Sequence, residues 1–121
     1  MKESELKHAV EEYLQFQQNL GRLLFLRLNA GDFIEARGET RRRIKGCPKG
    51  TADLLVLQGY ESASPEECCD SCVPIFLELK SDTGKQRPEQ LDFQGMVEEQ
   101  NAEYHIVRSV EEVMELVGGK A

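Results

Sequence analysis

The sequence predicts an α/β domain in which helices flank a small mixed β-sheet. Two short apolar runs rich in branched residues, at positions 51–57 and 73–80, are typical of neighbouring buried strands. Segments with apolar residues at helical spacing open the chain, close it and separate the last two strands. At 121 residues the chain is long enough to bury one core, so positions 1–121 are interpreted as a single domain.

The first half of the chain is expected to contain a helix followed by a strand. Ser4 is a suitable N-cap for the helix, and Gly21 marks its end. Positions 22–29 form the first strand, which closes with turn residues at 29–31. Positions 37–50, which glycine and proline interrupt, are predicted to be a loop or a ribbon beside the sheet. The apolar stripe of the helix consists of Leu6, Ala9, Val10, Tyr13 and Leu14.

The second half is expected to contain strand, strand, helix, strand and helix in that order. Positions 59–72, between the two buried runs, carry Gly, Ser, Pro and acids, which indicates a surface connection. Positions 81–86 form a turn, and Pro88 begins a helix that runs to about Asn101. A last strand covers 104–107, and glycines at 118 and 119 end the final helix. The predicted core contacts of the helix that begins at Pro88 are Leu91, Met96 and Val97.

The composition indicates a globular protein without a membrane segment. The chain is 40% hydrophobic and 31% charged, which is usual for globular proteins. No run approaches the roughly 20 apolar residues that cross a bilayer, and no targeting signal opens the chain. We therefore expect an intracellular, cytoplasmic location and no membrane partner.

Basic residues are concentrated in one segment of an acidic chain. The net charge is −7, but positions 37–50 hold six basic residues and one acid, a charge of +5 that leaves −12 on the rest. A local basic segment suits a partner with phosphate groups, although a solvated charged loop is the alternative. The residues interpreted as DNA contacts are Arg41, Arg42, Arg43, Lys45 and Lys49, with Asn29 and Lys85 outside the segment.

Three ionisable residues lie at the ends of the two buried runs. Side chains alternate along a strand, so Glu78 and Lys80 point to one face while Leu77 and Leu79 point to the other. Such an ionisable pair is costly to bury unless it is paired or holds a metal ion. Asp53, at the start of the companion run, can supply a second carboxylate. The alternative is a strand end at the surface with an ordinary ion pair.

The N-terminal helix offers a further acid. Glu5 and Glu12 lie along the edge of its apolar stripe, so either carboxylate could face a cleft, and Glu3 is a third candidate. For each of them, a glutamate that is only solvated is the alternative.

The four cysteines leave three interpretations open. Cys69-x-x-Cys72 with Cys47 and Cys68 could form a zinc site, but adjacent cysteines ligate poorly together and no second C-x-x-C pair is present. A disulfide is disfavoured in a reducing compartment. Free thiols are therefore the expected state.

The motifs occur in an order that resembles a nuclease superfamily. They are the N-terminal helical Glu, the Leu28-Asn29-Ala30-Gly31 turn, the approach from Lys49 to Asp53, Phe76-Leu77-Glu78-Leu79-Lys80, and the stretch from Gly84 to Gln90. Across nearly the whole chain this order is similar to the PD-(D/E)xK superfamily, and within it to the virus-type replication-repair nuclease (VRR-NUC) domain in its stand-alone phage form. Two departures are Ala52, where the superfamily has proline, and Arg87, where a Ser or Thr cap is usual. The loop at 59–72 is not part of the pattern.

The resemblance implies a restriction-endonuclease-like core that hydrolyses phosphodiester bonds in DNA. Mg²⁺ or Mn²⁺ is the implied cofactor, since hard cations bind carboxylates and carbonyls. Lys80 would orient the attacking water, stabilise negative charge or act as a base, and Gln90 would support the site from its helix. A homodimer that cuts branched DNA such as four-way junctions, in a phage-infected host cell, is also implied. The implied catalytic residues are Asp53, Glu78, Lys80 and Gln90, and the implied metal ligands are Glu5, Asp53, Glu78 and the backbone carbonyl of Leu79.

Two other functions fit part of the sequence. A DNA-binding module on a nuclease-like fold that does not cut would explain the basic segment. An acidic phage protein that engages host proteins would explain the charge of the body but not Asp53, Glu78 and Lys80. Because all three of these residues are present, the nuclease is the preferred interpretation.

Overall fold

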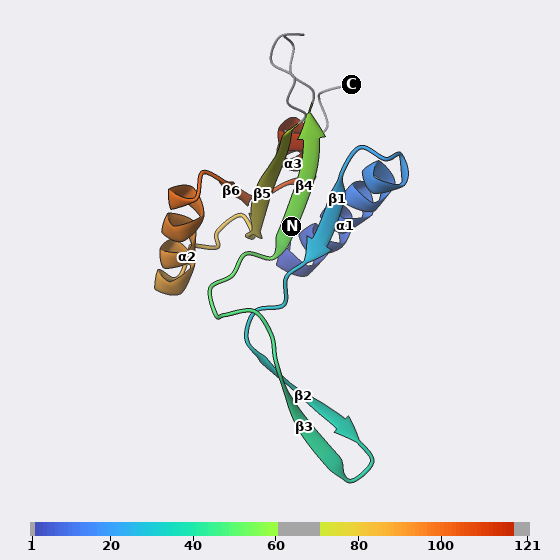
Figure 1. Ribbon diagram of the computed structural model, residues 1–121, viewed down its shortest axis with the longest axis vertical. Coiled ribbons are helices and arrows are strands. Elements are labelled where there is room, and N and C mark those ends of the chain that lie inside the picture. The colour runs from blue at the N-terminus through green and yellow to red at the C-terminus, as the bar shows by residue number, and fades with distance from the viewer. Residues whose placement is uncertain (1, 61–70, 118–121) are drawn as a thin grey trace.

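The protein consists of a four-stranded sheet with helices on both faces and a separate two-stranded arm (Figure 1). The computed structural model describes residues 2–60 and 71–117. The described elements are, in chain order, α1 (Glu3–Asn19), β1 (Leu24–Arg27), β2 (Asp32–Arg37), β3 (Thr40–Lys45), β4 (Leu54–Tyr60), β5 (Ser71–Leu79), α2 (Pro88–Glu99), β6 (Glu103–Val107) and α3 (Val110–Val117).

The main sheet is mixed, as predicted. Its strand order is β1-β4-β5-β6, in which β1, β4 and β5 are antiparallel neighbours and β6 runs parallel to β5. A parallel neighbour requires a crossover connection, which α2 supplies between β5 and β6. The predicted α/β class with helices around a mixed sheet is therefore confirmed.

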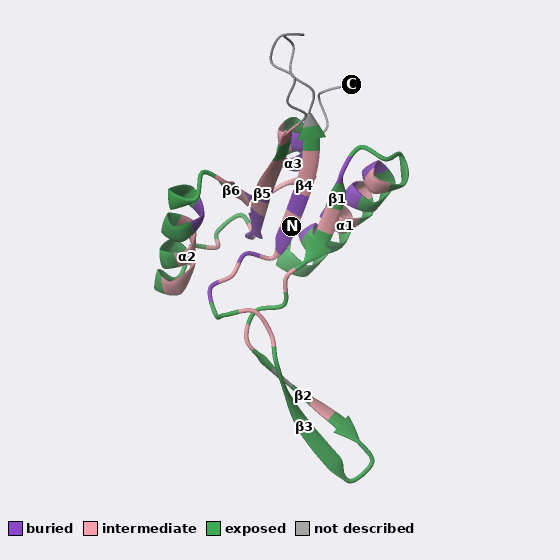
Figure 2. Cartoon of the chain, in the orientation of Figure 1, coloured by how far each residue is buried: buried purple, intermediate pink, exposed green. Residues whose placement is uncertain are grey.

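The two faces of the sheet carry different apolar clusters. Leu77 and Leu79 of β5 belong to a buried cluster that includes residues of α1 and α3. Phe76 belongs to a second cluster that includes residues of α2. The predicted alternation along β5 is thus present, and it turns Glu78 toward the α2 side of the sheet. Figure 2 shows that burial is concentrated along β4 and β5, between the helices.

β2 and β3 form a hairpin, here called the arm (residues 32–45), that projects from the body (Figure 1). None of its described residues belongs to either apolar cluster, and every residue of β3 is exposed. Backbone hydrogen bonds close its root, from Gly31 to Cys47, from Gly46 to Gly31 and from Cys47 to Asn29. The segment predicted to be a loop or ribbon is therefore a ribbon in its central part, and it does not join the main sheet.

α1 starts earlier than the sequence suggested. Lys2, not Ser4, is the N-cap, so that prediction is wrong. The side chain of Glu5 accepts a hydrogen bond of 3.4 Å from the Lys2 backbone N–H, which satisfies a donor that the helix leaves unpaired. Leu6, Val10 and Leu14 of the predicted stripe are fully buried. Neither α1 nor any other described helix is long and apolar enough to cross a membrane.

α2 buries a different set of side chains from the predicted one. Val97 is buried as expected, but Leu91 and Met96 are 53% and 59% exposed. Two glutamines occupy the inward face instead, because Gln90 hydrogen-bonds to Glu78 on β5 and Gln94 accepts a hydrogen bond from Gln86. A helix face that is partly polar inside cannot be located from apolar spacing alone.

Candidate functional site

Asp53 and Glu78 lie next to each other because of the register of β4 and β5. These strands are antiparallel and pair Leu54 with Leu77, so the residue before Leu54 lies beside the residue after Leu77. Asp53 also bonds across the strands, since its Oδ2 accepts a 2.8 Å hydrogen bond from the backbone N–H of Leu79. The carboxylate of Asp53 is therefore fixed at the end of β5.

Glu78 is the most buried acid of this group, and its two oxygens have different surroundings. Oε1 accepts a 2.7 Å hydrogen bond from Nε2 of Gln90 and lies 3.7 Å from Nζ of Lys80. Oε2 is buried and has no hydrogen-bond partner among residues 2–60 and 71–117. The side chains of Glu78 and Lys80 are only 3% and 9% exposed. An unsatisfied, buried carboxylate oxygen is costly, so this position is suited to bind a cation.

The pKa values of Asp53 and Glu78 also indicate that this position is suited to bind a cation. Burial raises the pKa of Asp53, and the hydrogen bond from Leu79 only partly offsets this. Burial and repulsion from Asp53 raise the pKa of Glu78 to about 7, against the attraction of Lys80. Two neighbouring carboxylates with raised pKa values destabilise each other when both are ionised, and a divalent cation between them would remove that repulsion.

The donor set suits one class of metal. Within residues 2–60 and 71–117, no three His, Cys, Asp or Glu side chains converge in a closed cluster. Mg²⁺ and Mn²⁺ do not require one, because Mg²⁺ sites commonly keep several waters and use one or two protein carboxylates. Asp53, the free Oε2 of Glu78 and oxygen ligands from a substrate fit that pattern. The residues present thus fit the predicted cofactor, with fewer protein ligands than the sequence suggested.

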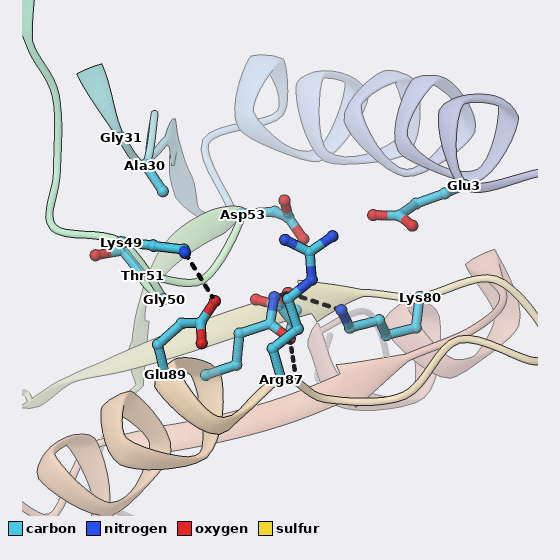
Figure 3. Close-up of a pocket in the computed structure, with 12 residues that line it drawn as sticks. Glu3, Ala30, Gly31, Lys49, Gly50, Thr51, Asp53, Lys80, Arg87 and Glu89 are labelled. Atoms are coloured by element: carbon cyan, nitrogen blue, oxygen red, sulfur yellow. Dashed lines mark hydrogen bonds and ion pairs between the residues drawn. The ribbon is translucent and has the colours of Figure 1, made fainter.

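The acids open into a pocket of about 430 Å³ at the root of the arm (Figure 3). Asp53 and Glu78 lie in it with Lys80 and Gln90. Its full lining is Glu3, Ala30, Gly31, Lys49, Gly50, Thr51, Asp53, Glu78, Lys80, Arg87, Glu89 and Gln90.

The N-terminal acid of the pocket is Glu3, not Glu5. Glu3 lines the pocket, whereas the carboxylate of Glu5 bonds to the backbone of Lys2 at the start of its own helix. Glu12, the other alternative, is exposed and lies 4.0 Å from His8 on the surface of α1. The geometry therefore corrects the choice of Glu5 as a ligand and favours Glu3.

The residues predicted to contact DNA lie in four places. Lys49 lines the pocket, 3.7 Å from Glu89. Lys85 is exposed in the turn before α2, and Asn29 is exposed at the root of the arm, where its carbonyl accepts a hydrogen bond from Cys47. The remaining four are on exposed β3 of the arm: Arg41, Arg42, Arg43 and Lys45.

The zinc interpretation finds no support in the described cysteines. Cys47 and Cys72 are both free thiols. Cys68 and Cys69, like the glycines predicted to end the final helix, lie outside the described residues.

Three features of the site were not predicted from the sequence. Gly50, with φ of +97°, lies so close to α2 that an added Cβ would be 2.4 Å from the carbonyl oxygen of Glu89. Arg108 donates from Nη1 to the carbonyls of Ser81 and Gly84, which holds the turn after Lys80. Arg87, noted only as an unusual residue before a helix, lines the pocket. Two of these residues could have been noticed in the sequence. Gly50 is a glycine in the basic segment, and Arg87 stands where a Ser or Thr cap is usual.

Comparisons with protein-family models, with curated proteins and with solved structures found no match to this chain.

Proposed function

We propose that this protein is a metal-dependent DNA endonuclease. The observation that carries the proposal is the convergence of Asp53, Glu78 and Lys80 in one pocket, with an unsatisfied buried oxygen on Glu78. The element order supports it as well, since the body follows the predicted series of helix, three strands, helix, strand and helix, with the arm inserted. Membership of the VRR-NUC group of PD-(D/E)xK nucleases is part of the same proposal.

The residues of the pocket have separable roles in this reaction. Asp53 and Glu78 would hold Mg²⁺ or Mn²⁺, with the carbonyl of Leu79 and Glu3 as further candidates. The bound cation supplies charge compensation at the phosphate and lowers the pKa of water. Lys80, held 3.7 Å from Glu78, orients the attacking water or stabilises the negative charge that develops on the phosphate. Gln90 donates to Oε1 of Glu78 and so keeps the orientation of that carboxylate constant.

The arm supplies the contacts that hold DNA. Its β3 strand presents a run of basic side chains to solvent, and its root forms one wall of the pocket through Ala30 and Gly31. A strand bound along the arm would therefore lead into the acidic site. Branched DNA as the substrate and a homodimer with two sites related by a two-fold axis follow from the resemblance to VRR-NUC nucleases.

A DNA-binding module that does not cut is the second candidate, since the exposed basic arm would serve it equally well. That function does not require a buried carboxylate with an unsatisfied oxygen, because an ionised carboxylate repels a phosphate when no cation lies between them.

A cleavage assay separates the two candidates. Wild-type protein should cut at least one of duplex, flap, splayed-arm and four-way DNA with Mg²⁺ or Mn²⁺, and EDTA should abolish cutting. Asp53→Asn and Glu78→Gln should reduce cleavage by at least about 10²-fold while DNA binding stays near the wild-type level. Binding without cleavage of any substrate, with either metal, would establish the binding module instead.

A further inference from the structure

Three cationic side chains line the pocket, and they differ in whether an acid neutralises them. Nζ of Lys80 lies 3.7 Å from Glu78, and Nζ of Lys49 lies 3.7 Å from Glu89. For Arg87, the described part of the chain supplies no carboxylate within ion-pair distance and no hydrogen-bond acceptor for its guanidinium, although Glu89, the partner of Lys49, also attracts it. Arg87 is thus the cation of the pocket lining that has no ion pair within the described residues.

The backbone of Arg87 is fixed although its side chain is exposed. Its N–H donates a 2.8 Å hydrogen bond to Oε1 of Gln90, and its carbonyl accepts from the N–H groups of Gln90 and Leu91. The same Gln90 donates to Glu78. The side chain of Gln90 therefore links the backbone of Arg87 to the carboxylate of Glu78. Figure 3 shows the guanidinium extending from the start of α2 toward the part of the pocket where Asp53 lies.

The charges of the pocket make this position significant for a phosphate. When the two ion pairs are set aside, the other charged groups of the pocket lining are the carboxylates of Glu3 and Asp53 and the guanidinium of Arg87. The carboxylates repel a phosphodiester, so an approaching strand needs a positive group at the pocket in addition to any cation bound by the acids. A guanidinium can bind two oxygens of one phosphate with parallel hydrogen bonds, which an ammonium cannot.

We infer that Arg87 forms a phosphate-binding subsite at the mouth of the pocket, where it grips the non-bridging oxygens of a nucleic-acid backbone phosphate beside the acidic pair. This inference rests on the proposed nuclease function for the identity of the ligand. Arg87 is in this view a substrate-contacting residue, and the proline that follows it serves to start the helix from a fixed point.

Duplex binding in EDTA tests the subsite without any metal-dependent reaction. Arg87→Ala keeps the backbone amide and carbonyl that bond to α2, so the helix start is preserved. Fluorescence anisotropy with a labelled DNA duplex should give a Kd about tenfold or more above wild type, and the slope of log Kd against log salt should fall by about one. Arg87→Lys should recover the slope but only part of the affinity, because it restores the charge and not the two-point contact.

Arg22→Gln is the matched control. Arg22 lies in the turn between α1 and β1, outside the pocket lining, and donates to Gln17, so its loss removes the same unit of charge far from the acids. This variant should leave the Kd within about twofold of the wild-type value. It should change the slope of log Kd against log salt by no more than a few tenths. If Arg87→Ala behaves like Arg22→Gln in both measurements, the subsite does not exist.

Cleavage kinetics with Mg²⁺ then separate the subsite from the nuclease proposal. If Arg87 contacts the phosphate that is cut, Arg87→Ala should lower kcat as well as raise KM, and Arg87→Lys should restore KM more than kcat. An effect confined to KM would place the contact on a neighbouring phosphate, which still supports the subsite. If the wild-type protein cuts no DNA, but Arg87→Ala still lowers the slope of log Kd against log salt by about one, the nuclease proposal is overturned and the subsite is supported.

Discussion

At the scale of single residues, Glu78 is the residue whose ionisation depends most on whether the pocket holds a cation. One of its oxygens is satisfied by Gln90 and Lys80, and the other has no partner. Its pKa is raised from 4.5 to about 7, so in the absence of metal the folded protein favours the protonated acid. The stability that this group contributes is fully present below pH 4.5 and is lost as the pH rises through about 7.

Metal-free wild-type protein should therefore lose stability between pH 5 and pH 8 relative to Glu78→Gln, by on the order of 2 kcal/mol. Thermal unfolding in EDTA at both pH values gives this difference. Adding Mg²⁺ at pH 8 should raise the Tm of wild type and leave the Tm of Glu78→Gln almost unchanged, because the cation compensates the ionised acid pair, which the variant lacks. If the Tm values of the two proteins change with pH in the same way, ionisation of Glu78 does not destabilise the folded protein.

The sequence predicted the central residues of the site better than its border. Alternation along a strand is a strict rule, so the placement of Glu78 and Lys80 on one face followed directly from spacing. The N-terminal acid depended on the exact start of α1. Glu3 and Glu5 are two positions apart, which is roughly 200° around a helix. Glu3 therefore lines the pocket, while Glu5 bonds to the backbone of Lys2.

At the scale of elements, the site depends on how closely the loop before β4 approaches α2. Gly50 allows the contact, since any Cβ there would collide with the backbone of Glu89. Gly50→Ala should destabilise the protein by about 2–4 kcal/mol and reduce cleavage, because it separates Asp53 and Gln90. Gly31→Ala is the control: its φ of +93° imposes similar strain, but open space surrounds the position. Chemical denaturation should show at least about 1 kcal/mol more loss for Gly50→Ala.

The arm has two kinds of arginine. Arg43 pairs with Asp32 and Arg37 pairs with Glu35, whereas Arg41 and Arg42 have no ion pair in the described structure. Replacing Arg41 and Arg42 together by Gln should weaken DNA binding and lower its salt slope by about two. The double replacement of Arg37 and Arg43 should have a smaller effect, since those guanidinium groups are already neutralised. Equal slopes for both double variants and wild type would show that the arm does not touch phosphates.

The arm and α2 also show which parts of the fold could not be predicted from the sequence. The arm lacks apolar alternation, because neither of its faces is buried in the core, so its strands left only a composition signal. α2 turns glutamines inward, and its exposed Leu91 and Met96 gave a misleading apolar pattern. The pairing partner and the register, which bring Asp53 to Glu78, are tertiary facts that no local pattern contains.

At the scale of the whole molecule, the arm extends from residues that line the pocket, Ala30 and Gly31. Each strand of the arm has six residues, which at about 3.4 Å per residue gives a reach of roughly 20 Å from the pocket. Along B-form DNA this corresponds to about six base pairs. Nuclease protection should therefore show a footprint that extends about six base pairs to one side of the cut. Replacing residues 33–44 by a short turn should remove that extension and leave the Tm of the body nearly unchanged.

The separation of the arm from both apolar clusters has a consequence for how such a protein can change. If the arm binds DNA as proposed, substitutions at positions 32–45 should alter binding without weakening the folded core, so this hairpin can diversify or be transplanted while the pocket stays constant. Its length and side chains are accordingly the natural place to re-engineer target preference.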